Sequence, residues 1–161
     1  MDLVTFLVST HPEFLEVKSI DGWTPLLVAA MVGRIEALQI LLDAGSYPFT
    51  TDPLERNMLH LLLVNPGMGT GLPDPNALSS FLRSMDNLIL RRLLEHRCVE
   101  NPGGLTPLAR WILLRPEPNV LFQTVLELSS AAVFETLDGQ GCTPLHVVSH
   151  ASFRAYFIPV N

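Results

Sequence analysis

The sequence is poor in charge and especially in lysine. Only 16% of its 161 residues are charged, and Lys18 is the only lysine among 10 basic residues. Because 16 residues are acidic, the formal net charge is −6, which argues against a nucleic-acid binder, whose contacts with phosphates need clustered basic side chains. Apolar residues make up 48% of the chain, far too many for an intrinsically disordered protein.

Long apolar runs are also missing. The apolar stretches are short, such as residues 59–64 around His60, and none approaches the roughly 20 residues that a membrane span needs. The N-terminus begins Met1-Asp2 and lacks the positive region of a secretory signal. Cys98 and Cys142 are far apart and form neither a CxxC motif nor a disulfide framework. We therefore expect an intracellular, cytoplasmic protein with reduced thiols and no membrane insertion.

What the sequence has is leucine, 29 residues of it, and an internal repeat. The tripeptide Thr-Pro-Leu begins at Thr24, Thr106 and Thr143, and a degenerate copy, Asn-Met-Leu-His, begins at Asn57. The spacings are 33, 49 and 37 residues, which are a period of 33 with insertions of 16 and 4. The repeat predicts an array of similar units stacked along one axis.

The motif has a local physical reason. Threonine caps a helix N-terminus by accepting a backbone N–H hydrogen bond, and proline fits the first helical turn, where its missing N–H is not needed. Gly22, Gly104 and Gly141 each precede the threonine by two residues, where glycine permits a tight turn. Each copy therefore predicts a turn followed by the start of a helix.

A period of 33 residues with Thr-Pro-Leu-His resembles the ankyrin repeat. Residues 21–45 carry the resemblance most closely, reading DGWTPLLVAAMVGRIEALQILLDAG. Gly33 separates the two expected helices, and Ile35, Leu38 and Leu42 form one apolar stripe on the second. One departure is Leu27, which stands where the family usually has histidine.

The resemblance implies a single all-α domain over residues 1–161, an ankyrin-repeat solenoid of about three to four helix-turn-helix repeats with short hairpin loops. TPR and HEAT arrays are alternatives, but their periods do not explain the three Thr-Pro-Leu starts. The expected units are a half-repeat at 1–20, repeats at 21–51, 52–100 (with an insertion at 65–76) and 101–137, and an incomplete repeat at 138–161. Half-repeats at both ends suggest a piece of a longer array, and a cap that folds back is the alternative.

The resemblance also implies a function, since ankyrin arrays bind proteins through hairpin tips and the exposed face of the first helices. We expect a non-enzymatic protein–protein interaction module with a concave binding surface. Its candidate residues are Ile20, Asp21, Trp23, Met31, Val32, Leu54, Arg56 and Leu105. Trp23 is the leading candidate because tryptophan is enriched at interface hot spots, but it could instead pack on the adjacent hairpin. The alternative function is a regulatory or sensor segment of a larger multidomain signalling protein.

Chemistry at a site has weaker support. Cys142, His146 and His150 could bind zinc, because the two histidines lie one helical turn apart. Ser149, His146 and Asp138 could form a catalytic set on paper, but no nucleophile-elbow or metalloprotease motif accompanies them. At the fourth motif position, His60 and His146 are expected to make structural hydrogen bonds. We therefore expect no cofactor, no metal and no enzymatic activity.

Overall fold

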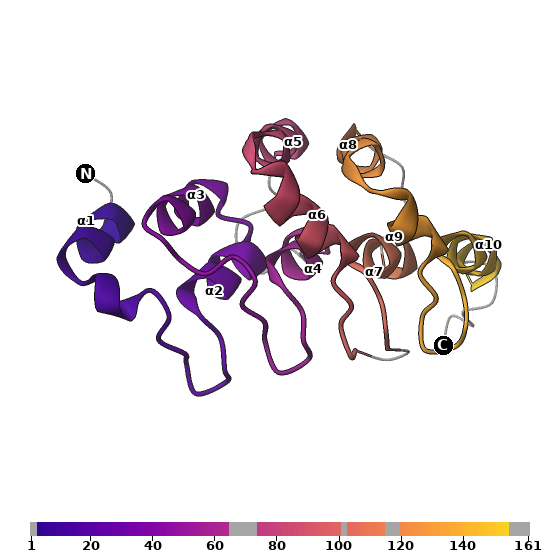
Figure 1. The fold of residues 1–161 in the computed structure, drawn as a ribbon, viewed down its shortest axis with the longest axis horizontal. Coiled ribbons are helices and arrows are strands. Elements are labelled where there is room, and N and C mark those ends of the chain that lie inside the picture. Colours follow the sequence, from indigo (N-terminus) through magenta and orange to yellow (C-terminus); the bar gives the residue numbers. More distant parts are fainter. Residues whose placement is uncertain (1–2, 65–73, 101–102, 115–119, 155–161) are drawn as a thin grey trace, which may run out of the picture.

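The computed structural model describes residues 3–64, 74–100, 103–114 and 120–154, the last five as backbone only. Its helices form two parallel rows (Figure 1). One row holds the helices that follow the repeated motif: α2 (Pro25–Val32), α4 (Met58–Leu62), α7 (Pro107–Leu114) and α10 (Pro144–Arg154). The other row holds α1 (Leu3–Thr10), α3 (Ile35–Asp43), α5 (Pro75–Ser84), α6 (Asn87–Glu95), α8 (Val120–Leu128) and α9 (Ala131–Glu135), and a short 3-10 helix, η1 (Pro12–Phe14), follows α1. This is the expected all-α solenoid.

The first helices begin where the motif predicts. The hydroxyls of Thr24, Thr106 and Thr143 each accept a hydrogen bond from the backbone N–H three residues later, and the side chain of Asn57 does the same in the degenerate copy. Proline follows each threonine at the first helical position. The helix-start prediction is confirmed in all four copies.

The turns before these helices need a left-handed backbone. Gly22, Gly104 and Gly141 have φ of 81°, 69° and 76°, as their position in the motif predicts. In the second copy Glu55 occupies the equivalent position with φ 57°, and it is the only residue other than glycine with positive φ among those described. The turn geometry is therefore kept even where the glycine is lost.

The second and third repeats differ from a simple helix-turn-helix. Each has two helices after its first helix, α5 with α6 and α8 with α9, where the first repeat has α3 alone. At the break between α5 and α6, Asp86 accepts backbone N–H hydrogen bonds at the start of α6, as Asp74 does at the start of α5, whereas Ser130 before α9 makes no such bond. The expected insertion at 65–76 thus ends earlier, since α5 begins at Pro75, and residues 65–73 lie outside those described. Helix α5 of the second repeat and helix α8 of the third repeat lie against each other (Figure 1).

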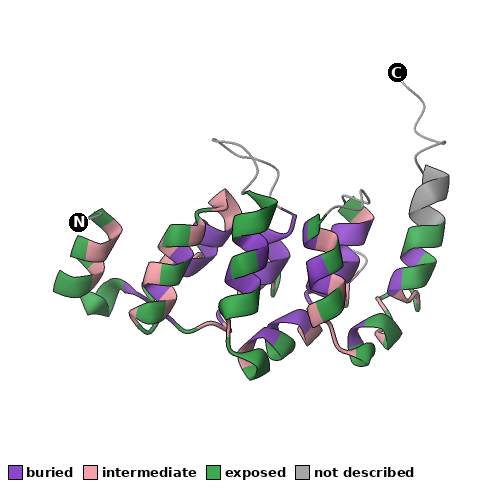
Figure 2. Cartoon of the chain, turned by 90° about the horizontal axis from the view of Figure 1, so that it is seen from above, coloured by how far each residue is buried: buried purple, intermediate pink, exposed green. Residues whose placement is uncertain are grey.

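The core runs between the two rows of helices (Figure 2). Leucines dominate it, and those of the motif, Leu26, Leu59 and Leu108, are fully buried. Trp111 is buried too, and its ring meets that of Phe122 edge to face at 5.4 Å. No helix of the described chain is long and apolar enough to cross a membrane.

Candidate protein-interaction surface

The hairpins that precede the first helices project together on one side of the solenoid (Figure 1). Each is closed by the same backbone hydrogen bond, from Ser19 N to Trp23 O at 2.8 Å and from Asp52 N to Arg56 O at 3.1 Å, with an equivalent bond at Asp138. One carboxylate oxygen of Asp52 also accepts hydrogen bonds from the backbone N–H groups of Leu54 and Arg56. The hairpin tips are thereby held in place without help from a partner.

Side chains at these tips are open to solvent. Ile20 is fully exposed at the tip of the first hairpin, with the carboxylate of Asp21 beside it. Leu54 is exposed at the tip of the second hairpin. Met31 and Val32 are half-buried at the C-terminal end of α2. The structure thus leaves five predicted residues accessible on or near the hairpin row, and their role in binding remains a prediction.

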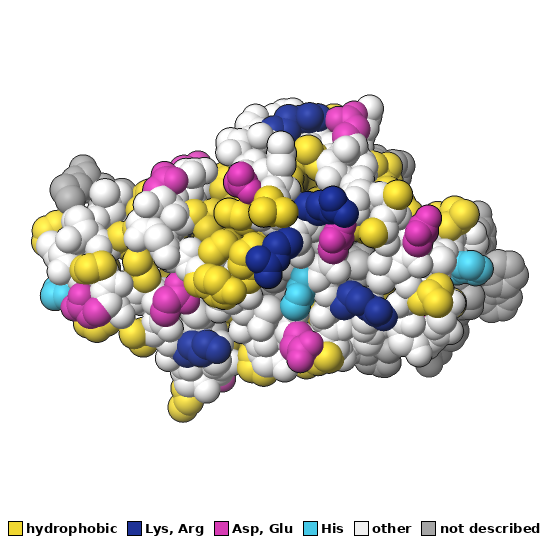
Figure 3. All heavy atoms as spheres, in the orientation of Figure 1, with side chains coloured by type: hydrophobic (Ala, Val, Ile, Leu, Met, Phe, Trp, Pro, Cys, Tyr) yellow, Lys and Arg dark blue, Asp and Glu magenta, His cyan; other side chains and the backbone are white. Residues whose placement is uncertain are grey.

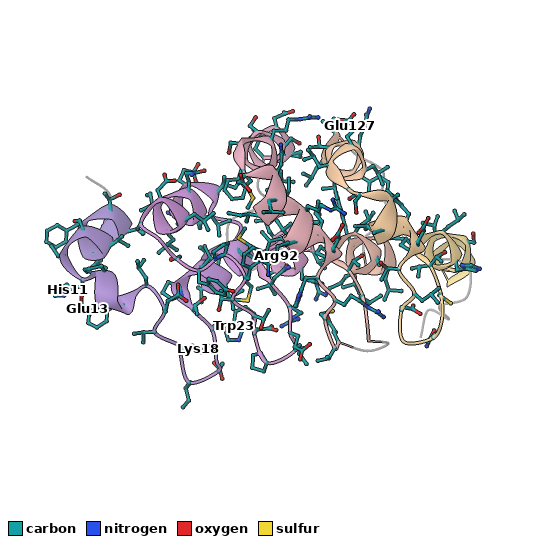
Figure 4. The ribbon with its side chains drawn as sticks, in the orientation of Figure 1. His11, Glu13, Lys18, Trp23, Arg92 and Glu127 are labelled. Carbon is teal, nitrogen blue, oxygen red and sulfur yellow. The ribbon has the colours of Figure 1, made fainter. Side chains whose placement is uncertain are left out.

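Trp23 and Arg56 hold neighbouring hairpins together. The guanidinium of Arg56 lies 5.7 Å from the centre of the Trp23 ring, a cation–π distance, and Trp23 also packs against the core (Figure 4). Both side chains are half-buried. Trp23 therefore packs on the adjacent hairpin, as the alternative prediction had it. Part of its ring stays accessible to a partner.

Leu105 is a correction. We expected it on the binding surface, but its side chain is only 1% exposed and packs with Cys98 and Ala109. Leu105 pairs with Cys98 in an isolated antiparallel bridge, and its backbone closes the third hairpin as those of Trp23 and Arg56 close theirs, so its burial comes from the packing of its side chain. Leu105 does not belong to an accessible surface.

Beneath the hairpins lies a charged network that the sequence did not reveal. Arg110 is buried on α7, where its guanidinium pairs with the Glu100 carboxylate and donates to the backbone carbonyl of His60 at 2.7 Å. Arg56 joins the network, with 2.6 Å to buried Asp52 and 3.7 Å to Glu100. Each buried charge thus has a partner of opposite sign, which offsets the cost of removing it from water.

His60 makes the structural hydrogen bonds expected of it. Its Nε2 lies 2.9 Å from the carbonyl oxygen of Leu105, which can only accept, so Nε2 donates, and Nδ1 accepts from the Asn57 N–H at 3.3 Å. Loss of hydration on burial lowers the pKa of His60 to about 3. Burial likewise raises the pKa of the Cys98 thiol, which keeps it protonated and a poor nucleophile. These groups stabilise the interior rather than react.

The candidate metal site gains no support. Among the described residues, no group of three His, Cys, Asp or Glu side chains is placed to hold a metal ion. His146 Nδ1 accepts from the Thr143 N–H at 3.3 Å and lies 2.7 Å from the Thr143 hydroxyl, while the side chain of His150 lies outside those described. Asp138 and Cys142 are joined within their hairpin, because Asp138 accepts from the Cys142 N–H at 2.9 Å. The contacts of these residues shape a hairpin and a helix cap.

An apolar groove lies at the N-terminal end of the array, between α1 and η1 on one side and α2 on the other. It has a volume of about 610 Å³. Its walls include Leu7, Phe14, Trp23, Val28 and Val32. Sequence reasoning placed Trp23 and Val32 on a hairpin-and-helix surface but did not foresee a groove, because it depends on how α1 packs.

The family model of the ankyrin repeat matches residues 21–53, which cover the first complete repeat, α2 and α3 with the second hairpin. Residues 21–53 form an ankyrin repeat. No curated protein matches the sequence. The same caps and turns recur in the other three copies of the motif, and the second and third copies are each followed by two helices. Ankyrin repeats generally serve as protein–protein interaction modules and are not enzymes, which agrees with the structural roles of His60 and Cys98.

Proposed function

We propose that this ankyrin-repeat protein is a non-enzymatic recognition module that binds a protein partner through the concave surface of its hairpins and first helices. The observation that carries the proposal is the pair of exposed apolar tips, Ile20 and Leu54, on hairpins fixed by their own hydrogen bonds. Exposed leucine and isoleucine side chains on a rigid support can bind with little loss of conformational entropy. We further propose that binding takes place inside the cell, in the cytoplasm.

A second hydrophobic surface suits a partner less well. Hydrophobic side chains also gather above the hairpins in the view of Figure 3, near Arg92, which Figure 4 labels and whose guanidinium is 4.2 Å from the centre of the Phe49 ring. Arg92 thereby partly covers that aromatic ring. The tips of Ile20 and Leu54 have no such cover, because their side chains extend from turns.

Site-specific photo-cross-linking in lysate of the source cells tests the proposal. A cross-linking amino acid at position 20 should capture a defined protein, whereas the same group at position 36 should not, because Glu36 is exposed on α3, in the other row. With that partner purified, Ile20→Asp and Leu54→Asp should each weaken binding about tenfold, the effect of removing a moderate hot spot. Equal capture from positions 20 and 36, or unchanged affinity in both variants, would contradict it.

A further inference from the structure

The groove beside α2 coincides with a missing neighbour in the stacking of the repeats. The fourth residue after each helix cap is Val28, Leu61, Arg110 or Val147. The last three are 5%, 7% and 8% exposed. Arg110 shows that side chains at this position point toward the preceding first helix, since it donates to the His60 carbonyl there. Val28 is 41% exposed and lines the groove. The groove is therefore the place where a preceding first helix would lie.

Helix α1 also lacks a first helix to pack against among the described residues. It packs on α3 as a second helix does, yet it has no buried residue, whereas α3 buries Leu38 and Leu41 (Figure 2). Its apolar side chains Leu3, Phe6 and Leu7 are exposed. In the described structure no first helix lies beneath α1 to cover them.

The C-terminal end of the described array has a first helix, α10, with an exposed face. Helix α10 follows a closed hairpin and a threonine cap, as a first helix does, and packs on α7. The leucine two residues after the cap is fully buried in the first three copies, but Leu145 is 73% exposed. His146, Val148 and Ser149 are exposed beside it. This face is of the kind that the next repeat covers elsewhere in the array.

We propose that the chain associates head to tail with a second copy of itself, the α10 hairpin and helix of one copy occupying the groove between α1 and α2 of the next. α10 and α1 then form one composite repeat, and α10 packs on α2 of the neighbour as α4 packs on α2 within the chain. The internal contact between α2 and α4 supplies the pattern for this interface. Because the two surfaces differ, the contact is heterologous and can continue into chains of molecules.

A second copy of the chain suits the groove because its exposed helix has the type that the groove lacks. Within the described residues, each surface lacks what the other provides: no first helix lies beside α1 and α2, and no second helix or further repeat covers α10. Burying Val28, Leu145 and the apolar side chains of α1 together removes exposed leucine, valine and phenylalanine from water, which favours association. Ile20 and Leu54, which carry the proposed partner binding, lie at the hairpin tips, so the two proposals can fail separately.

Sedimentation velocity of the full chain over a wide concentration range is the test. We expect dimers and longer species to grow with concentration, and Val28→Glu or Leu145→Glu to weaken self-association by about tenfold or more. Both positions are exposed, so the variants should keep their helical circular dichroism. Leu88→Glu is the matched control, because Leu88 is similarly exposed on α6, away from both surfaces, and it should associate as the original chain does.

Mixing the two variants makes the test decisive. Val28→Glu spoils the groove but keeps α10 intact, and Leu145→Glu does the reverse. An equimolar mixture should therefore form 1:1 dimers and nothing larger, whereas each variant alone stays monomeric. A chain that is monomeric at every concentration would overturn the proposal, and so would variants that do not pair on mixing. Pairing that tolerates both substitutions would point to a different interface and overturn it as well.

Discussion

His60 and His146 occupy the same position of the repeated motif, one in the middle of the array and the other in its last described repeat. Both accept a hydrogen bond at Nδ1 from the backbone N–H of the cap residue three positions earlier. Only His60 also reaches forward to the carbonyl of Leu105 in the next repeat, and only His60 is fully buried. The motif thus specifies the helix cap. Contacts with the neighbouring repeat determine how much the histidine adds to the free energy of unfolding.

The strongest test of this comparison is alanine at each histidine. His60→Ala should lower the free energy of unfolding by about 3 kcal/mol, because it leaves a cavity and a buried carbonyl without a donor. His146→Ala should cost about 0.5 kcal/mol, since water can replace its hydrogen bonds. Urea unfolding followed by circular dichroism measures both. Equal losses at the two positions would show that the next repeat adds nothing to the value of His60.

A second test contrasts the buried and exposed arginines. Arg110→Met should destabilise by about 2 kcal/mol, because Glu100 loses a partner and the His60 carbonyl loses a donor in the interior. Arg83→Met is the control, since Arg83 and Glu127 form an exposed pair between α5 and α8 and its loss should cost less than about 0.5 kcal/mol. Urea midpoints at low salt compare the two variants. A larger loss from Arg83→Met would reverse our ranking of the two pairs.

Acidification probes His60 without a mutation. Its pKa is lowered to about 3 in the folded chain, against an ordinary histidine value of 6.5, so the unfolded chain binds the proton more readily. Stability from the neutral imidazole is complete above pH 6.5 and is lost as the pH falls below that value. Between pH 7 and 5 the loss should be about 2 kcal/mol.

His60→Gln removes the group that titrates and serves as the control for the acid prediction. Its free energy of unfolding, measured by urea at several pH values, should change by less than that of the original chain between pH 7 and 5. The same slope in both proteins would mean that other groups cause the acid sensitivity and that burial of His60 does not.

The first helices could be predicted because their signals are local. A threonine cap, a proline and a glycine two residues before the cap lie within a few positions of one another, and all three proved to have the expected geometry at Thr24, Thr106 and Thr143. The divided second helices were missed although Asp74 and Asp86 are cap residues, because the repeat pattern favoured one helix there. Residue type and periodicity located the array but not its irregular parts.

The candidate surface was harder to predict because it depends on contacts across the array. Leu105 appears in the motif where Trp23 and Arg56 do, but its side chain is buried against Cys98 and Ala109. Arg110 would be read as an exposed helix residue from its charge, and its partner Glu100 lies before the turn that precedes α7. The groove exists only because α1 and α2 meet without a first helix between them. Such features follow from three-dimensional neighbours, which one sequence does not contain.

A last test compares the turn position in the first and second hairpins. Glu55 holds φ 57°, which an L side chain adopts at a cost of about 1 kcal/mol, so Glu55→Gly should stabilise the chain by up to about that amount. Gly22→Ala is the counterpart, since φ is 81° and a new Cβ would lie 3.1 Å from Cγ of Pro53, so it should destabilise by about 1 kcal/mol. Thermal unfolding should shift in opposite directions for the two variants. A loss of stability in Glu55→Gly would mean that the glutamate side chain, rather than the turn, determines the stability of the second hairpin.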